Sequence, residues 1–124
     1  IICGLVIDTL LVVNNYRDRE NDKCDGKITL IVRIGEKKAE KLYLALGLMT
    51  YLQMLLLLFS GERDNLLPFI FVFIIFIPYG ILHYKTAMQM KQIKKGKELN
   101  IILAQTARNM LIYGIATTIA LVGL

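Results

Sequence analysis

The stretch "LYLALGLMTYLQMLLLLFS", residues 42–60, contains no charged residue. It is nearly as long as the roughly 20 residues that a helix needs to cross the core of a bilayer, so it predicts a transmembrane helix. The composition of the whole chain favours the same interpretation: 56% of the 124 residues are hydrophobic and the mean hydropathy is +0.55. That is more apolar surface than a soluble domain of this size buries. We therefore expect an integral membrane protein.

Three more apolar segments surround this one. Residues 66–82, "LLPFIFVFIIFIPYGIL", follow the polar segment "GERDN"; Pro68 suits a first helical turn, and Pro78 is tolerated within a membrane helix. Residues 109–124 form a third span that begins earlier, within "LNIILAQTAR", and residues 1–13 have the composition of the end of a fourth. The sequence thus predicts an all-α polytopic transmembrane helix bundle of about four helices, without strands. Because the chain begins "IICGLVID", we expect its N-terminal part to be missing.

The positive charges are concentrated between these spans. Of the 15 Lys and Arg residues, eight lie in residues 14–41 and five in residues 83–98, whereas residues 61–65 contain only Arg63. Two spans separate the basic segments, so both belong on one side, which the positive-inside rule makes cytoplasmic. We expect the inner (cytoplasmic) membrane as the location and membrane lipid as a partner. The net charge of +5 alone would allow nucleic-acid binding, but no basic surface with interleaved aromatic residues supports it.

A polar stretch, "VNNYRDRENDKCDGKITL" (residues 13–30), lies between two apolar ones. If the first helix continues into it, Asn14, Asp18 and Asp22 recur every fourth residue and share one helical face, drifting about 40° per step. Amide and carboxylate oxygens suit Mg²⁺, which takes one or two protein carboxylates and completes its shell with water and phosphate oxygens. The spacing therefore predicts a Mg²⁺ site on this face. An EF-hand loop is excluded, because Lys23 would stand where its glycine is required.

Basic side chains alternate with these oxygen ligands. Four cations lie among the acids: Arg17, Arg19, Lys23 and Lys27. Such cations bind the outer oxygens of a diphosphate; the Arg guanidinium does so through two parallel hydrogen bonds, and the Lys ammonium acts as a single point charge. The alternative is a solvated surface loop held by salt bridges. We predict that Arg17, Lys23 and Lys27 bind a diphosphate.

The longer segment "NNYRDRENDKCDGKITLIVRIG" (residues 14–35), of the form NNxRDxxxDxxxGKxTLxxxxG, resembles the second Asp-rich motif of the UbiA superfamily of membrane prenyltransferases. It is most similar to the branch that prenylates 1,4-dihydroxy-2-naphthoate in menaquinone biosynthesis, and the tail of residues 99–124 is similar to that branch too. The resemblance implies that residues 1–124 are the C-terminal portion of one nine-helix membrane domain. The first Asp-rich motif of the family has no counterpart here, so we expect this portion alone to be inactive.

The resemblance also implies an activity: Mg²⁺-dependent transfer of a polyprenyl group from an allylic polyprenyl diphosphate to an aromatic acceptor. By this resemblance, the metal ion and the diphosphate would be bound by Asn14, Asp18 and Asp22, of which Asp18 and Asp22 would be catalytic. Arg17 and Lys27 match basic positions that lie near the diphosphate in the family. Alternatives remain open: another UbiA-type aromatic or haem prenyltransferase, or a membrane transporter or structural subunit with a basic, lipid-facing loop. CDP-alcohol phosphotransferases also place Asp ladders in membrane helices, but their longer pattern is absent.

Two further features of the apolar segments invite a functional interpretation. Asp8 lies within an apolar run, where an ionisable group is costly, and it shares a helical face with Asn15 and Asp22. Asp8 and Asn15 are thus possible site-lining residues, or Asp8 makes a structural hydrogen bond to a neighbouring helix. His83 is expected at the membrane interface rather than in catalysis, because no acid or nucleophile lies near it in the sequence.

Overall fold

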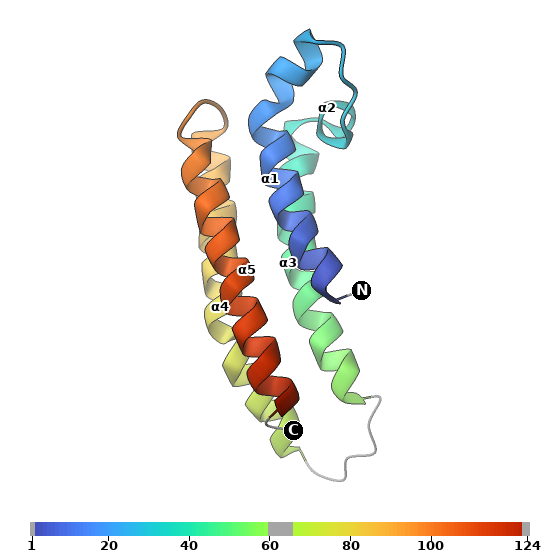
Figure 1. The fold of residues 1–124 in the computed structure, drawn as a ribbon, viewed down its shortest axis with the longest axis vertical. Helices are drawn as coiled ribbons and strands as arrows, with labels where there is room; N and C mark the ends of the chain where they lie inside the picture. The colour runs from blue at the N-terminus through green and yellow to red at the C-terminus, as the bar shows by residue number, and fades with distance from the viewer. Residues whose placement is uncertain (1, 60–65, 123–124) are drawn as a thin grey trace.

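The computed structural model describes residues 2–59 and 66–122, and all the regular structure in these ranges is α-helical. The predicted all-α bundle is confirmed, with one short helix, α2, that was not predicted. The five helices are α1 (Ile2–Cys24), α2 (Leu30–Ile34), α3 (Glu36–Phe59), α4 (Leu67–Ile93) and α5 (Leu99–Val122) (Figure 1).

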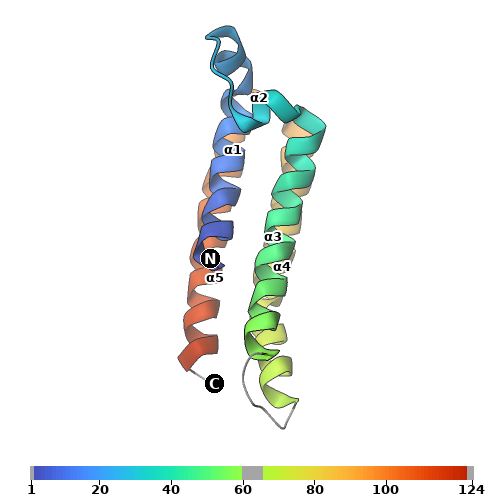
Figure 2. The same cartoon turned by 90° about the vertical axis from the view of Figure 1, so that its right-hand side faces the viewer.

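The four long helices run side by side. Helix α1 packs against α3 and α5, and α4 packs against the same two helices. The α1–α3 connection and the α4–α5 connection both lie at one end of the bundle, and the C-terminus lies at the other end (Figures 1 and 2). The two basic segments are therefore at the same end, as predicted from the number of helices between them.

The long helices extend beyond the apolar segments. Helix α1 continues through the polar stretch to Cys24, and α4 continues past Leu82 to Ile93. In α1, Arg, Glu and Lys alternate with the weaker helix formers Asn and Asp, and the extension of α4 is rich in Lys, Met, Gln and Ala. The change from apolar to polar residues therefore stops neither helix. Many of the cations expected in loops, such as Arg17 and Lys91, consequently lie on helices.

Helix α2 is bounded by two local features. The Thr29 side chain accepts a hydrogen bond from the backbone N–H of Val32 at 3.3 Å, which caps the start of the helix. Gly35 follows its end with a φ of 80°, a conformation that favours glycine. Ile31 is buried against the core. These residues turn the chain from α1 into α3.

In the part of the chain that the structure describes, the core consists of two clusters along the bundle. The cluster nearer the basic end includes Tyr16, Tyr43 and Met90, and the other includes Phe76 and Tyr113.

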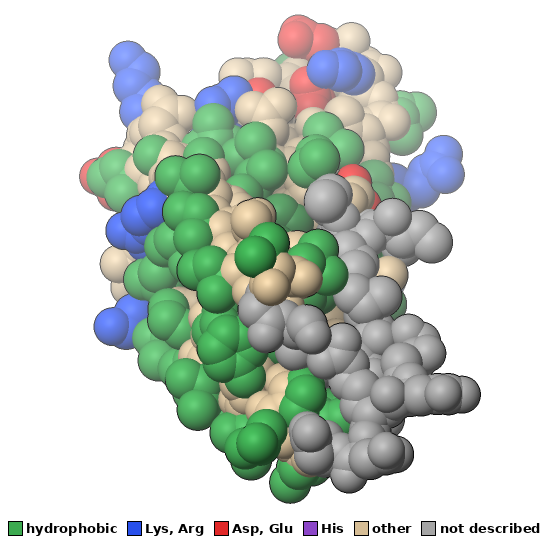
Figure 3. All heavy atoms as spheres, turned by 60° about the horizontal axis from the view of Figure 1, so that its bottom comes forward, with side chains coloured by type: hydrophobic (Ala, Val, Ile, Leu, Met, Phe, Trp, Pro, Cys, Tyr) green, Lys and Arg blue, Asp and Glu red, His purple; other side chains and the backbone are tan. Residues whose placement is uncertain are grey.

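Many large apolar side chains remain exposed, and they lie over the outer faces of the long helices. Figure 3 shows hydrophobic side chains covering much of one face, with charged side chains mainly along its upper edge and one side. Within the described residues, α4 is the one helix that is long and apolar enough to cross a membrane. The last residue of the predicted span 42–60 and the segment of residues 61–65, with Arg63, lie outside the described residues.

Candidate functional site

Arg17 is the centre of a polar cluster at the basic end of the bundle. Its Nε and Nη2 donate to the two carboxylate oxygens of Asp18 at 2.7 and 2.8 Å, forming a bidentate pair. Nη2 also donates to Asn14 Oδ1 at 2.9 Å, and Nη1 donates to Asn100 Oδ1 at 3.0 Å. Arg17 therefore connects α1 to the first turn of α5.

The charges of this cluster reinforce each other. The Arg17 guanidinium, by hydrogen bonding and its charge, holds the pKa of the Asp18 carboxyl below its usual range. The Asp18 carboxylate in turn raises the pKa of Arg17. Both groups are thus ionised at neutral pH, as expected for a bidentate Arg–carboxylate pair.

Two of the predicted metal ligands converge. Asn14 Oδ1 and Asp18 Oδ2 both accept from the same nitrogen of Arg17, as the spacing of four residues on α1 allows. The point between them therefore already accommodates a positive charge. Hard oxygen donors around a cationic position fit Mg²⁺. No group of three or more His, Cys, Asp or Glu side chains suited to a metal ion occurs among the described residues, so a metal here would need water or substrate oxygens as its other ligands.

Asp22, the third predicted ligand, lies in a different environment. It is only 7% exposed, and its Oδ1 lies 3.4 Å from Nζ of Lys27. The Asp22 carbonyl also accepts from the backbone N–H of Lys27 at 2.7 Å. Asp22 and Lys27 thus close the turn after α1, and in the described part of the chain neither side chain forms a hydrogen bond or ion pair with the side chain of Asn14 or Asp18. The charge of Lys27 adds to the effect of Arg17 in lowering the pKa of the Asp18 carboxyl.

A groove of about 780 Å³ opens beside Asp18. Its walls come from α1 and from the α4–α5 connection; they are formed by Arg17, Asp18, Glu20, Asn21, Lys95, Gly96, Lys97 and Asn100. The predicted diphosphate ligands Lys23 and Lys27 do not line it. Sequence reasoning missed Lys95, Lys97 and Asn100 as site residues, although the charge distribution had placed their segment on the same side of the membrane.

A second polar cluster supports α1 from the side of α3. Arg19 is buried, donates to Tyr16 O and to Glu36 Oε2, both at 2.7 Å, and lies 4.2 Å above the Tyr16 ring. The Tyr16 hydroxyl donates to Glu40 Oε1 at 3.0 Å. Burial, followed by the hydrogen bond to Glu40, raises the pKa of Tyr16. These contacts fix α1 against α3, so Arg19 has a structural role next to the groove.

Asp8 and Asn15 do not line the groove beside Asp18. Asp8 is exposed and Asn15 partly exposed. Their role in lining a site stays a prediction.

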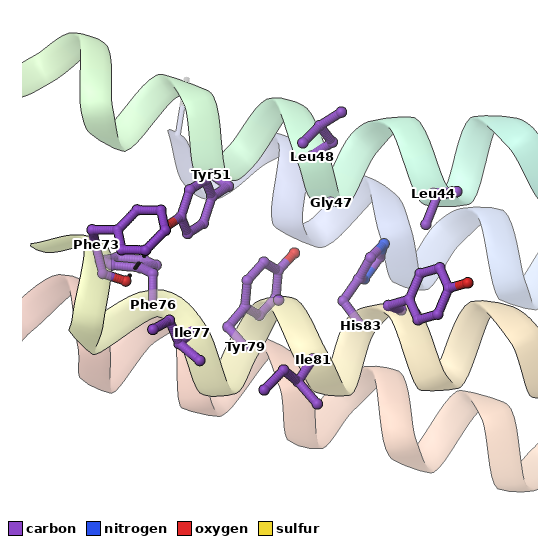
Figure 4. Close-up of a pocket in the computed structure, with 12 residues that line it drawn as sticks. Leu44, Gly47, Leu48, Tyr51, Phe73, Phe76, Ile77, Tyr79, Ile81 and His83 are labelled. Carbon is purple, nitrogen blue, oxygen red and sulfur yellow. Dashed lines mark hydrogen bonds between the residues drawn. The ribbon is translucent and has the colours of Figure 1, made fainter.

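A second cavity, of about 520 Å³, lies between α3 and α4 and has almost entirely apolar walls (Figure 4). His83 lines it and is buried, with Nε2 3.0 Å from the carbonyl oxygen of Tyr43. The His83 ring stacks on Tyr43 and Tyr79, with centroid distances of 4.5 and 5.6 Å. His83 is therefore buried beneath α3, and its expected position at the membrane interface stays a prediction. Among the described residues that line this cavity there is no Asp, Glu, Lys or Arg, so it lacks the carboxylates and cations that a metal-bound diphosphate needs.

The chain is 45% identical over 44 residues to 1,4-dihydroxy-2-naphthoate octaprenyltransferase of Escherichia coli (strain K12). The predicted resemblance to such a prenyltransferase is confirmed over this stretch. The match takes in 36% of this chain and 14% of the length of the relative. No family model matches the chain. No solved structure matches it either.

Proposed function

We propose that this chain is the C-terminal part of a membrane prenyltransferase that moves a polyprenyl group from an allylic polyprenyl diphosphate to an aromatic acceptor, 1,4-dihydroxy-2-naphthoate. One observation carries the proposal: Asn14 and Asp18 present two oxygens to one cationic position, within a segment typical of such enzymes. The similarity to the E. coli octaprenyltransferase supports prenyl transfer as the reaction, and the acceptor is proposed by analogy with the name of that relative.

The residues at this position suit a departing diphosphate. Asn14 and Asp18 would hold Mg²⁺, which when bound neutralises the charge that develops on the leaving group. Arg17 now donates to the same two oxygens. If Asn14 and Asp18 held a metal ion, the Arg17 guanidinium would be free to bind phosphoryl oxygens in bidentate fashion.

The environment of the site fits a substrate with a polar head and a long apolar tail. The polar groove lies at the end of the bundle where the charged residues gather, and exposed apolar side chains cover much of the remaining helix surface. A polyprenyl diphosphate would match these two environments, because its isoprenoid tail would lie in the membrane and its diphosphate at the polar end of the bundle. A cation formed from the prenyl group also requires the exclusion of water, which an apolar surrounding provides.

The proposal is tested by replacing Asp18 with Asn in the full-length protein. The change keeps the shape of the side chain but removes its charge, so prenylation of dihydroxynaphthoate in membranes should fall by roughly a hundredfold or more, as expected when about 3 kcal/mol of transition-state stabilisation is lost. The matched control is Asp25→Asn, because Asp25 is exposed, follows the same helix and lies outside the groove. Its activity should be normal.

Two results would contradict the proposal. Wild-type membranes that prenylate neither dihydroxynaphthoate nor another aromatic acceptor would exclude the enzyme function. Equal activity of Asp18→Asn and wild type would exclude the metal-diphosphate role of Asp18. Activity on a different acceptor alone would correct only the substrate.

A further inference from the structure

The connection between α4 and α5 belongs to the wall of the groove. It turns sharply, with positive φ values at Lys94 (58°) and Gly96 (96°). Asn100, in the first turn of α5, accepts from Arg17, which holds the connection against α1. This contact joins residues that are 83 positions apart in the sequence.

The connection brings cations to the groove that have no counter-charge. Arg17 is paired with Asp18, and Glu20 lies 3.7 Å from Arg19. Lys95 and Lys97 line the groove as well, and in the part of the chain that the structure describes neither forms an ion pair. The unpaired charge in the groove is therefore positive and comes from the α4–α5 connection.

Asn100 adds a neutral donor to the same wall. Its Oδ1 is used by Arg17, which leaves the Nδ2 group of the side-chain amide to donate. Two ammonium groups from the connection and one amide from the first turn of α5 thus accompany Asp18 and Arg17. Ammonium and amide donors of this kind suit a multiply charged phosphoryl group.

We propose that Lys95 and Lys97 bind the diphosphate of the prenyl substrate, in the groove that they share with the Asp18–Arg17 pair. This inference rests on the proposed function and extends it, because it assigns substrate binding to a connection outside the Asp-rich segment. Lys23 and Lys27, which the sequence suggested for this role, do not line the groove.

The experiment measures binding of inorganic pyrophosphate with Mg²⁺ by calorimetry, using the full-length protein in phosphatidylcholine nanodiscs. The double variant Lys95→Gln/Lys97→Gln should bind about a hundredfold more weakly, about tenfold for each lost charge-assisted hydrogen bond. Lys95→Arg/Lys97→Arg keeps both charges and should bind within about threefold of wild type, which also shows that the connection tolerates substitution. The matched control is Lys91→Gln/Lys94→Gln, which removes two neighbouring charges outside the groove and should leave affinity nearly unchanged.

The outcomes separate this inference from the proposed function. If Lys95→Gln/Lys97→Gln binds pyrophosphate as tightly as wild type while Asp18→Asn does not bind it, the proposed role of Lys95 and Lys97 is overturned and the proposed function stands. If the lysine variant keeps its affinity for pyrophosphate but loses affinity for phosphatidylglycerol vesicles, the lysines serve lipid headgroups and the inference is again overturned. A wild-type protein that binds no pyrophosphate and shows no prenylation would overturn both proposals.

Discussion

Gly47 of α3 faces the ring of His83 of α4 with no space for a side chain between them. A Cβ atom at Gly47 would overlap the imidazole ring. The ring cannot easily turn away, because it contacts the carbonyl oxygen of Tyr43 and stacks on Tyr43 and Tyr79. The close packing of α3 on α4 thus depends on the absence of a side chain at position 47.

Replacing Gly47 by Ala should therefore destabilise the bundle. Overpacking of a well-packed contact costs about 1 to 3 kcal/mol, and we expect a lower midpoint of thermal unfolding, measured by circular dichroism in detergent. Gly80→Ala is the matched control: it lines the same cavity, but a Cβ atom there meets nothing within 4 Å. That change should be neutral or slightly stabilising, because Ala is the better helix former.

A double-mutant cycle identifies the cause. His83→Ala removes the ring, so Gly47→Ala should cost much less in a His83→Ala background, and the coupling should exceed about 1 kcal/mol. Equal costs of Gly47→Ala with and without the ring would show that the two side chains do not compete for space.

The buried Arg19 should contribute more to stability than the exposed cations around it. Arg19→Gln removes the contacts to Tyr16 O, Glu36 and the Tyr16 ring. Breaking a fully buried ion pair costs about 3 to 5 kcal/mol; because Glu36 is partly exposed, we expect about 2 kcal/mol in chemical unfolding. Arg33→Gln, at an exposed position, should change stability by no more than about 0.5 kcal/mol. Equal effects of the two substitutions would show that the contacts of Arg19 with Tyr16 and Glu36 do not hold α1 against α3.

The arrangement of the helices predicts which residues share a side of the membrane. Cys24 is exposed at the end of α1, and a cysteine introduced at Lys94 lies in the connection at the same end of the bundle. Both should react with a membrane-impermeant thiol reagent from the cytoplasmic side. In a protein whose native Cys3 and Cys24 are replaced by Ser, a cysteine at Val122, at the opposite end of α5, should react only from the other side. Labelling of Lys94→Cys and Val122→Cys from one side would show that α5 does not cross the membrane.

The sequence by itself determined the local features of this protein. Apolar runs and their lengths predicted the long helices, and the spacing of four residues placed Asn14 and Asp18 on one face of α1. Both depend on the repeat of a single helix, which can be read from neighbouring residues. The helix ends were less predictable, because charged residues continue a helix as readily as they end an apolar span.

Contacts between distant segments were decided by the tertiary structure alone. Arg17 meets Asn100, and Gly47 meets His83, only because of how α1 packs on α5 and α3 on α4. The faces on which two helices meet, and their relative position along the helix axes, depend on the fit of all their side chains together. The spacing of residues within one segment does not specify this fit.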